Sequence, residues 1–287
     1  MINLNTDTKY HIHANEDLLQ KDNTLDQFES VLNEDSCVKG VLMPDAHQWY
    51  TMPIGWVTLN LDKIYPSYVG YDIWCWVYAV RTDLKVSDIE SSLEDIHKKI
   101  KEEIPVGVGK FYDEPIGSVG KEHTDFVDNL LCKYNHQLGT LWWGNHFIEI
   151  DKDEYDNVWV VIHSGSRGLG GKVAQHYMDK AKEQYKKENV HIEEIKQDLR
   201  DEFAKNKPDF KKHKPEKFKK YQRQYVKDNI DEKLRNYTKE KKWGYWFALQ
   251  SWLGESYVLD MKYCLEFALR NREIMANKVL DIIEADS

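Results

Sequence analysis

The chain has 287 residues, a hydrophobic fraction of 41%, an aromatic fraction of 13% and a formal net charge of −9 at pH 7. These values exclude a disordered protein and allow a substantial buried core. No apolar run approaches the roughly 20 residues that cross a bilayer. The N-terminus also lacks the residue order of a signal peptide, so we expect a cytoplasmic protein without a membrane segment. The four cysteines form no C-x-x-C pair, which argues against a disulfide scaffold or a zinc ribbon.

The first part of the chain predicts one helix, several short strands and a second helix. Helical spacing of apolar residues marks the first helix near residues 25–32. Short apolar runs among Gly, Pro and aromatic residues in 41–82 predict strands joined by tight loops. Residues 84–104 predict an amphipathic helix, with Ser87 as its N-cap and Glu90 completing a capping box. Four apolar residues share one face of this helix: Ile89, Leu93, Ile96 and Ile100.

The rest of the chain alternates between helices and strands without a regular pattern. We expect a helix around 126–131, a strand at 147–150 and a buried strand at 158–162. Residues 171–242 predict charged helices, and a last helix spans about 256–283. Two prolines interrupt the charged helices: Pro208 and Pro215. Because the elements show no βαβ alternation, the predicted fold class is α+β.

One segment is strongly basic in an otherwise acidic chain. Residues 205–227 carry ten Lys or Arg against two acidic residues. Nucleic-acid binders often concentrate positive charge in this way, because each neutralised phosphate releases counterions. A solvated helical hairpin also explains the charge, and from charge alone it is the preferred interpretation.

Four short segments hold most of the unusual residues: 43–47, 70–75, 138–150 and 161–170. Asp72 and Cys75 stand three positions apart in a turn-like sequence, so both side chains can reach one point. His146 and His163 each lie near a strand end. Together they form an O, S, N, N donor set that suits a divalent transition metal, with zinc, manganese and iron all permitted. Taken singly, each of the four residues has a simpler structural explanation, such as a hydrogen-bonded histidine or a buried apolar cysteine. Spacing alone therefore does not decide whether they form a metal site.

The last of these segments also predicts an anion site. Ser164, Ser166 and Arg167 follow a buried strand in the sequence Ser-Gly-Ser-Arg-Gly and open a helix. Backbone N–H groups, two hydroxyls and a guanidinium suit a phosphate. A glycine-rich turn from strand to helix is the alternative.

In this order, the four segments resemble blocks of the RtcB family of RNA ligases, which read approximately M-P-D-x-H, G-x-D-I-G-C-G, L-G-T-L-G-x-G-N-H-F-I-E and H-S-G-S-R-G. The resemblance is close over about 41–170 and weaker in the last helix. It implies an α+β fold of mixed sheets with surrounding helices. Residues 1–287 would form a catalytic domain whose C-terminal part is missing, with a lysine-rich helical excursion at 180–245.

The resemblance also implies roles for individual positions. The ligands of two manganese ions match Asp72, Cys75, His146 and His163, with Cys75 as the bridging thiolate. The residues that contact the guanine nucleotide match Asn145 and Glu149. The block for the anionic substrate contains Ser164, Ser166 and Arg167. A segment that supports the active site matches Asp45 and His47.

Enzymes of this family join RNA ends that bear a 3′-phosphate or a 2′,3′-cyclic phosphate to a 5′-hydroxyl. GTP guanylylates a histidine, GMP passes to the RNA 3′-phosphate, and attack by the 5′-hydroxyl releases GMP. The resemblance thus implies tRNA splicing or RNA repair, with Mn²⁺ and GTP as cofactors and RNA as partner. It leaves open whether an activating protein such as archease takes part.

Two departures from the family pattern matter. None of the eleven histidines stands in an H-G-A-G-R block, which carries the nucleophile in the family, and the chain ends at Ser287. We therefore expect a fragment that forms no GMP adduct by itself. Tryptophan also replaces glycine of the family pattern at six positions: Trp49, Trp56, Trp74, Trp76, Trp142 and Trp143. Our hypothesis is that the gene reads UGA as glycine and that these residues are recoded glycines.

Two other functions stay open. A non-catalytic relative that binds metal or RNA becomes the better interpretation if the six tryptophans are genuine. A metal-dependent phosphoesterase acting on cyclic phosphate ends would use the same ligands without guanylylation.

Overall fold

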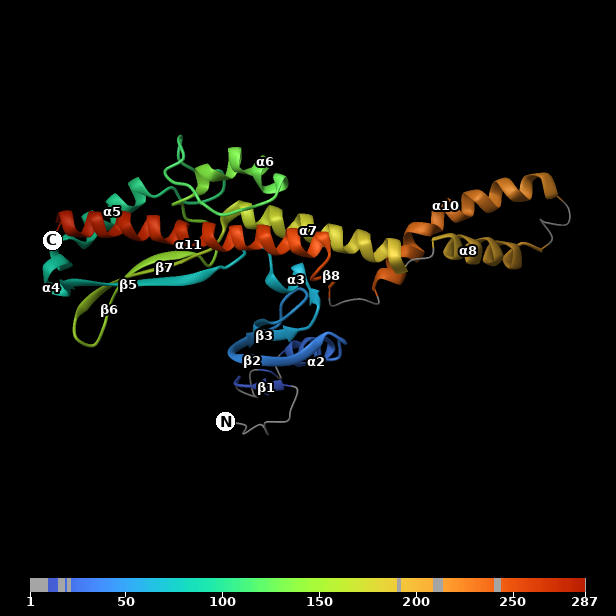
Figure 1. Ribbon diagram of the computed structural model, residues 1–287, viewed down its shortest axis with the longest axis horizontal. Coiled ribbons are helices and arrows are strands. Elements are labelled where there is room, and N and C mark those ends of the chain that lie inside the picture. The colour runs from blue at the N-terminus through green and yellow to red at the C-terminus, as the bar shows by residue number, and fades with distance from the viewer. Residues whose placement is uncertain are drawn as a thin grey trace. The chain divides into compact units, whose positions relative to one another are not determined.

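The computed structural model describes residues 10–14, 19, 22–189, 192–208, 214–239 and 244–286. The chain divides into two compact units: Met1–Tyr68 with Met178–Phe247, and Val69–Tyr177 with Ala248–Ser287. Figure 1 shows helices and several small sheets, which confirms the predicted α+β class. Among the described residues, no helix combines the length and apolarity that a membrane span requires.

The first unit contains a three-stranded sheet of β1 (Tyr10–Ile12), β2 (Cys37–His47) and β3 (Ile54–Asn60). Strand β1 runs parallel to β2, and β2 runs antiparallel to β3. Helix α2 (Thr24–Leu32) packs against this sheet through Phe28 and Leu32, and Figure 1 shows the helix beside β2. The predicted helix near 25–32 is therefore confirmed, and β2 and β3 confirm that strands begin the predicted strand region 41–82.

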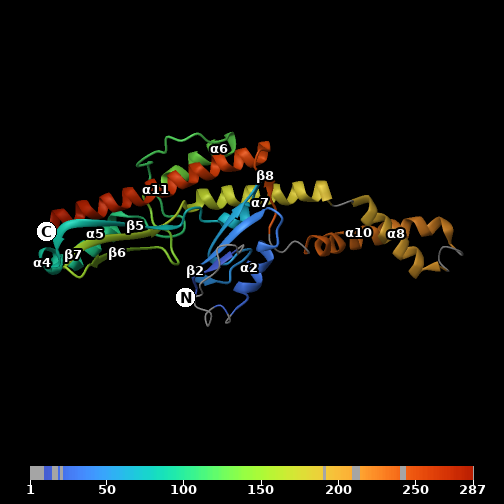
Figure 2. The same cartoon turned by 60° about the horizontal axis from the view of Figure 1, so that its bottom comes forward.

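The same unit contains a pair of charged helices, α8 (Ile192–Asn206) and α10 (Pro215–Lys239). They lie side by side in Figures 1 and 2 and pack through Leu199 and Val226. The ring of Phe203 lies 5.3 Å from that of Phe218. Pro215 is the first residue of α10. At this position a proline costs no helical hydrogen bond, because the first N–H groups of a helix have no partner within it.

Four further elements are short or lie at the boundary between the two units. Strand β4 (Lys63–Ile64) pairs with β8 (Phe247–Ala248), and helix α3 (Pro66–Val69) follows β4. Helix α7 (Arg167–Asn189) begins in the second unit and continues into the first.

The second unit is built on an antiparallel sheet in the order β5 (Trp76–Lys85), β7 (Asn157–Ser164) and β6 (Phe147–Lys152). One face of the sheet packs against α5 (Leu93–Glu103) and α11 (Trp252–Asp286), and Figures 1 and 2 show α11 running along it. Helix α6 (Asp125–Tyr134) and a 3₁₀ turn at Asn135–Gln137 precede β6.

Strand β7 separates core residues from site residues by simple alternation. Val158, Val160 and Ile162 are buried under α11 and α5, whereas His163 belongs to the other, less buried set. Successive side chains of a strand point to opposite faces. The strand that builds the core therefore also presents His163 on the face away from the helices.

The predicted helix at 84–104 is real but starts differently from the prediction. It is broken into α4 (Val86–Ile89), a 3₁₀ turn (Glu90–Ser92) and α5. Lys85, not Ser87, is the N-cap, because the Asp88 carboxylate accepts the Lys85 N–H at 2.8 Å. Ser87 and Glu90 thus form no capping box. Leu93 is 42% exposed, so the predicted apolar face is wrong at that position.

Candidate metal centre

The turn before β5 carries Asp72 and Cys75. The Cys75 N–H donates to the Asp72 carbonyl oxygen at 3.0 Å, which closes the turn, and Trp74 inside it has a φ of +57°. Ile73 is fully buried and anchors the turn on the core. The carboxylate and the thiol, both half-buried, are left to face one point.

His146 and His163 come together because β6 pairs with β7. Phe147, the first residue of β6, pairs with His163, so His146 stands one residue before that pairing. The two imidazole rings lie 5.5 Å apart between centroids. His163 is also hydrogen-bonded to the Asn145 backbone. A hydrogen bond of this kind fixes the orientation of an imidazole that binds a metal.

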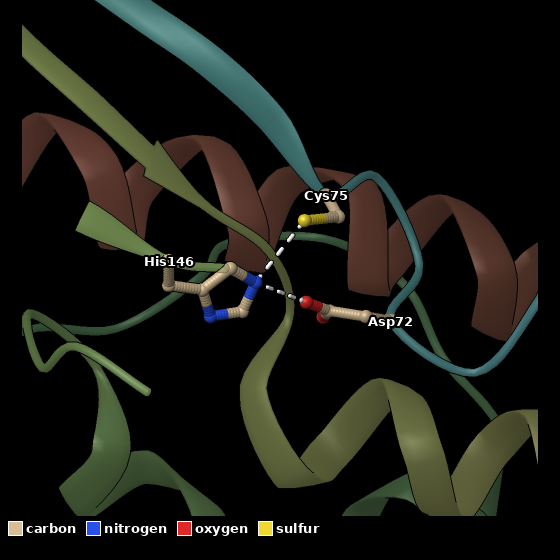
Figure 3. Close-up of side chains that lie close together, drawn as sticks. All are labelled: Asp72, Cys75 and His146. Atoms are coloured by element: carbon tan, nitrogen blue, oxygen red, sulfur yellow. Dashed lines mark hydrogen bonds and ion pairs between the residues drawn. The ribbon is translucent and has the colours of Figure 1, made fainter. Parts of the chain in front are cut away.

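Three of the predicted ligands share one place, because the donor atoms of Asp72, Cys75 and His146 all lie within 4.8 Å of one another, and the fourth, His163, contacts Cys75. The His146 Nε2 lies 2.9 Å from the Asp72 Oδ2 and 3.1 Å from the Cys75 Sγ. The same Sγ lies 3.0 Å from the His163 Nε2. Figure 3 shows the first three side chains pointing at one another from the turn before β5 and from the start of β6.

The donor set fits a divalent transition metal. The edge of a ligand tetrahedron with bonds of about 2.1 Å is about 3.4 Å, so a bound ion would lengthen these three donor contacts by only a few tenths of an ångström. Carboxylate, thiolate and imidazole together suit zinc, iron or manganese. Geometry therefore supports a metal centre without selecting the metal.

The protonation of the ligands also bears on how a cation would bind. Burial, followed by the nearby Asp72 charge, raises the pKa of the Cys75 thiol to about 12. Burial and the neighbouring His146 lower the pKa of His163, which keeps its imidazole neutral. Among the described residues, the buried Nδ1 of His146 has no hydrogen-bond partner. A divalent cation would turn the thiol into a ligand by displacing its proton.

Gly165 allows the loop after β7 to pass close to the ligands. A Cβ at this position would collide with the Asp72 carboxylate. Next to it, the Ser166 Oγ donates to the Asp72 Oδ1 at 3.5 Å, and the Ser164 Oγ accepts a hydrogen bond from the Asn271 Nδ2 at 3.1 Å. Both serine hydroxyls therefore have protein partners.

Arg167 offers a buried cation that its protein partners satisfy only in part. Its side chain is 5% exposed, and its Nε donates to the Thr140 Oγ1 at 2.9 Å. The guanidinium lies 4.8 Å from the Trp142 ring centroid, and burial lowers its pKa to about 10. Within the described chain, neither Nη1 nor Nη2 has a partner. An anion placed there would accept from both nitrogens.

The remaining predicted site residues are spread over the molecule. Asn145 and Glu149 are exposed, on the loop before β6 and on β6 itself. Asp45 and His47 lie in the first unit, where the His47 Nδ1 is 2.7 Å from the Asp45 carbonyl oxygen. Their relation to the four ligands in the second unit stays a prediction.

Sequence reasoning missed two residues on α11, Asn271 and Arg272. Both are buried, at 0% and 2% exposure, and both contact backbone beside the ligands. The signal was an Asn-Arg pair inside an apolar helical stripe. Asn271 stands four residues after Phe267 and four before Met275, which are both buried.

The six tryptophans at predicted glycine positions behave differently from one another. Trp74 alone has a positive φ, the conformation that glycine adopts without strain. Trp56 packs edge-on against Phe28 with ring centroids 5.3 Å apart, so its indole has a structural role. Trp76 and Trp143 are both 60% exposed. Backbone conformation thus supports recoding at one position, and the hypothesis as a whole stays a prediction.

Comparison with known proteins agrees with the resemblance. The family model for tRNA-splicing ligase RtcB matches residues 27–130 and 114–286. The RNA-splicing ligase RtcB of Escherichia coli K12 is 33% identical over 165 residues, which cover 50% of this chain and 40% of that protein. The tRNA-splicing ligase RtcB of Nanoarchaeum equitans is 32% identical over 231 residues, covering 61% of this chain and 48% of that protein.

A third relative, the tRNA-splicing ligase RtcB of Aeropyrum pernix, is 30% identical over 228 residues, covering 58% of this chain and 47% of that protein. The chain thus spans less than half the length of each of these relatives. The family model reaches from residue 27 to residue 286, and the chain belongs to the RtcB family.

Proposed function

We propose that this chain is the metal-binding part of an RNA ligase that joins RNA 3′-phosphate or 2′,3′-cyclic phosphate ends to 5′-hydroxyl ends. The grouping of Asp72, Cys75 and His146, with His163 in contact with Cys75, carries the proposal. We further propose Mn²⁺ as the metal, GTP as the source of the guanylyl group and the cytoplasm as the location. The names of the relatives support RNA splicing as the setting.

The chain's own residues divide the work around the metal. Asp72, Cys75 and the two histidines would hold the ion, which supplies polarisation of phosphoryl oxygens when bound. The Nη1 and Nη2 of Arg167, which have no hydrogen-bond partner among the described residues, would bind a phosphate, where burial strengthens the charge-assisted hydrogen bonds. We assign the guanine nucleotide to the exposed loop and strand that carry Asn145 and Glu149. Ser164 and Ser166 would shape the phosphate loop, and Asp45 and His47 would support the site.

A basic surface on α10 supports RNA as the partner. Five side chains of this helix are exposed and basic: Lys217, Lys219, Lys220, Arg223 and Lys227. At 3.6 residues per turn they form a continuous arc of about 160°. Phe218 and Val226 on the opposite side are buried. In the described part of the chain none of the five makes an ion pair. Two other lysines of the basic segment 205–227, Lys211 and Lys212, lie outside the described residues.

The first test is binding of short RNAs with and without Mn²⁺. We expect Mn²⁺ to tighten binding of RNA with a 3′-phosphate more than binding of the same RNA with a 3′-hydroxyl. Asp72→Asn and His163→Gln should remove this difference, because each deletes a ligand. Lys152→Gln is the control, since Lys152 is exposed and forms an ion pair with Asp156. Equal Mn²⁺ effects on the two RNA ends would contradict the proposal.

A second test separates ligation from hydrolysis. The chain is incubated with Mn²⁺, GTP and RNA that ends in a 2′,3′-cyclic phosphate. Conversion of the ends to 3′-phosphate without joined product would favour the phosphoesterase alternative for this chain. End-selective binding without either product would favour a non-catalytic relative that binds metal and RNA.

A further inference from the structure

Arg272 ties together the two backbone segments that carry Cys75 and His163. A single nitrogen, Nη1, donates to the Trp74 carbonyl oxygen at 2.9 Å and to the Ser164 carbonyl oxygen at 2.6 Å. Each carbonyl belongs to the residue next to a predicted ligand. The pairing of β5 with β7 brings these segments together, with Trp76 opposite Ser164, and the guanidinium links them at the strand ends beside Cys75 and His163.

Asn271 connects the third ligand segment to the same place. Its Oδ1 accepts from the Thr140 N–H at 3.1 Å, in the loop that leads to His146. Its Nδ2 donates to the Ser164 Oγ at 3.1 Å and to the Gly165 carbonyl oxygen at 3.4 Å. With Arg272, it links all three segments that deliver metal ligands.

The helix that carries this pair is well suited to hold it still. Helix α11 has 35 residues and packs along the sheet through a buried stripe that includes Met275 and Val279. A buried guanidinium is costly unless its hydrogen bonds are made. Arg272 makes two, both to carbonyl oxygens beside the site and neither to a carboxylate.

We infer that Asn271 and Arg272 are positioning residues that set the spacing of the metal ligands. They lie outside the set of four ligands and act on it through backbone. The inference rests on the proposed metal centre. Loss of residues that orient metal ligands typically weakens metal binding by about 10–100-fold. We expect that range for Arg272→Met, and about tenfold for Asn271→Asp, which keeps the acceptor for Thr140 but loses both donated bonds.

The test is a cobalt(II) titration of the 287-residue chain, followed by absorption. Cobalt(II) accepts the same donors, and its thiolate charge-transfer band and visible bands report whether Cys75 binds and how regular the geometry is. Arg272→Met and Asn271→Asp should bind more weakly, with a reduced and shifted charge-transfer band. Arg270→Met is the matched control on the same helix, because Arg270 is partly exposed and forms an ion pair with Glu273.

Each outcome gives a decision. If the unmodified chain shows no cobalt bands, the proposed metal centre fails. If it binds and the folded variants match its affinity and spectrum, the positioning inference is overturned while the metal centre stands. Thermal melts without metal identify which variants fold. Should Arg272→Met not fold, Asn271→Asp decides, because it conserves shape. An unchanged cobalt spectrum in Asn271→Asp refutes the inference, and a weakened one supports it.

Discussion

The backbone conformation of Trp74 predicts that a glycine variant is more stable than an alanine variant at this position. At the nearby Trp76 the opposite order of stability is expected. Trp74 has a φ of +57°, and we compare its replacement by glycine with its replacement by alanine. Both variants lose the same indole contacts, including the one with Arg272, so their difference isolates the backbone. A left-handed residue with a Cβ costs about 1–2 kcal/mol. The larger unfolded-state entropy of glycine offsets about 0.5–1 kcal/mol of this.

We therefore expect Trp74→Gly to be more stable than Trp74→Ala by about 0.5–1 kcal/mol. The control is the same pair at Trp76, which lies in β5 and does not have a positive φ. There glycine should be less stable than alanine by about 0.5–1 kcal/mol. Urea unfolding of the four variants measures both differences at constant slope. Equal stability of the two Trp74 variants, or alanine ahead, would refute the reasoning about this turn.

Three other predictions concern RNA binding, pH and guanylylation. Replacing Lys219 and Lys220 on α10 with Glu should reduce the slope of log affinity for single-stranded RNA against log salt concentration by about 1.4, because two phosphate contacts are lost. The control Lys101→Glu on α5 should leave the slope unchanged. An unchanged slope in the α10 variant would mean that this basic surface is solvated and does not bind RNA. Burial raises the pKa of Tyr65 and Tyr112 from 10.0 to about 12. The stability that these tyrosines contribute is therefore complete below pH 10 and falls as the pH rises towards 12. Urea midpoints that stay constant across this pH range would contradict the raised pKa values. Incubation with labelled GTP and Mn²⁺ should leave no acid-labile label on this chain, whose histidines include none in an H-G-A-G-R block, and a stoichiometric adduct would sink that expectation.

The sequence predicted elements well where apolar spacing was regular. The strand at 158–162 and the helix at 256–283 appear as β7 and α11, because alternating or helical patterns of large apolar residues have few other solutions. The start of the helix at 84–104 was mispredicted. Serine is the commoner N-cap residue, but here the Asp88 carboxylate accepts the Lys85 N–H, so the helix begins two residues earlier than a Ser87 cap would require.

The ligand cluster was only partly predictable from spacing. Asp72 and Cys75 share one turn, so their proximity follows from local chain geometry. His146 and His163 are 17 residues apart and meet only through the register of β6 on β7, which spacing does not reveal. Asn271 escaped prediction because a polar residue in a helix is usually exposed, and its partners lie more than 100 residues away.

Because side chains alternate along β7, the register of this one strand places both the core residues and His163 of the candidate metal centre. A one-residue slip of this strand would turn Ile162 towards the ligands and His163 into the apolar layer under α11. An insertion or deletion in β7 would therefore damage metal binding and folding stability together. Substitutions can tune either face separately, but changes of length in β7 are expected to be absent among functional variants of this chain.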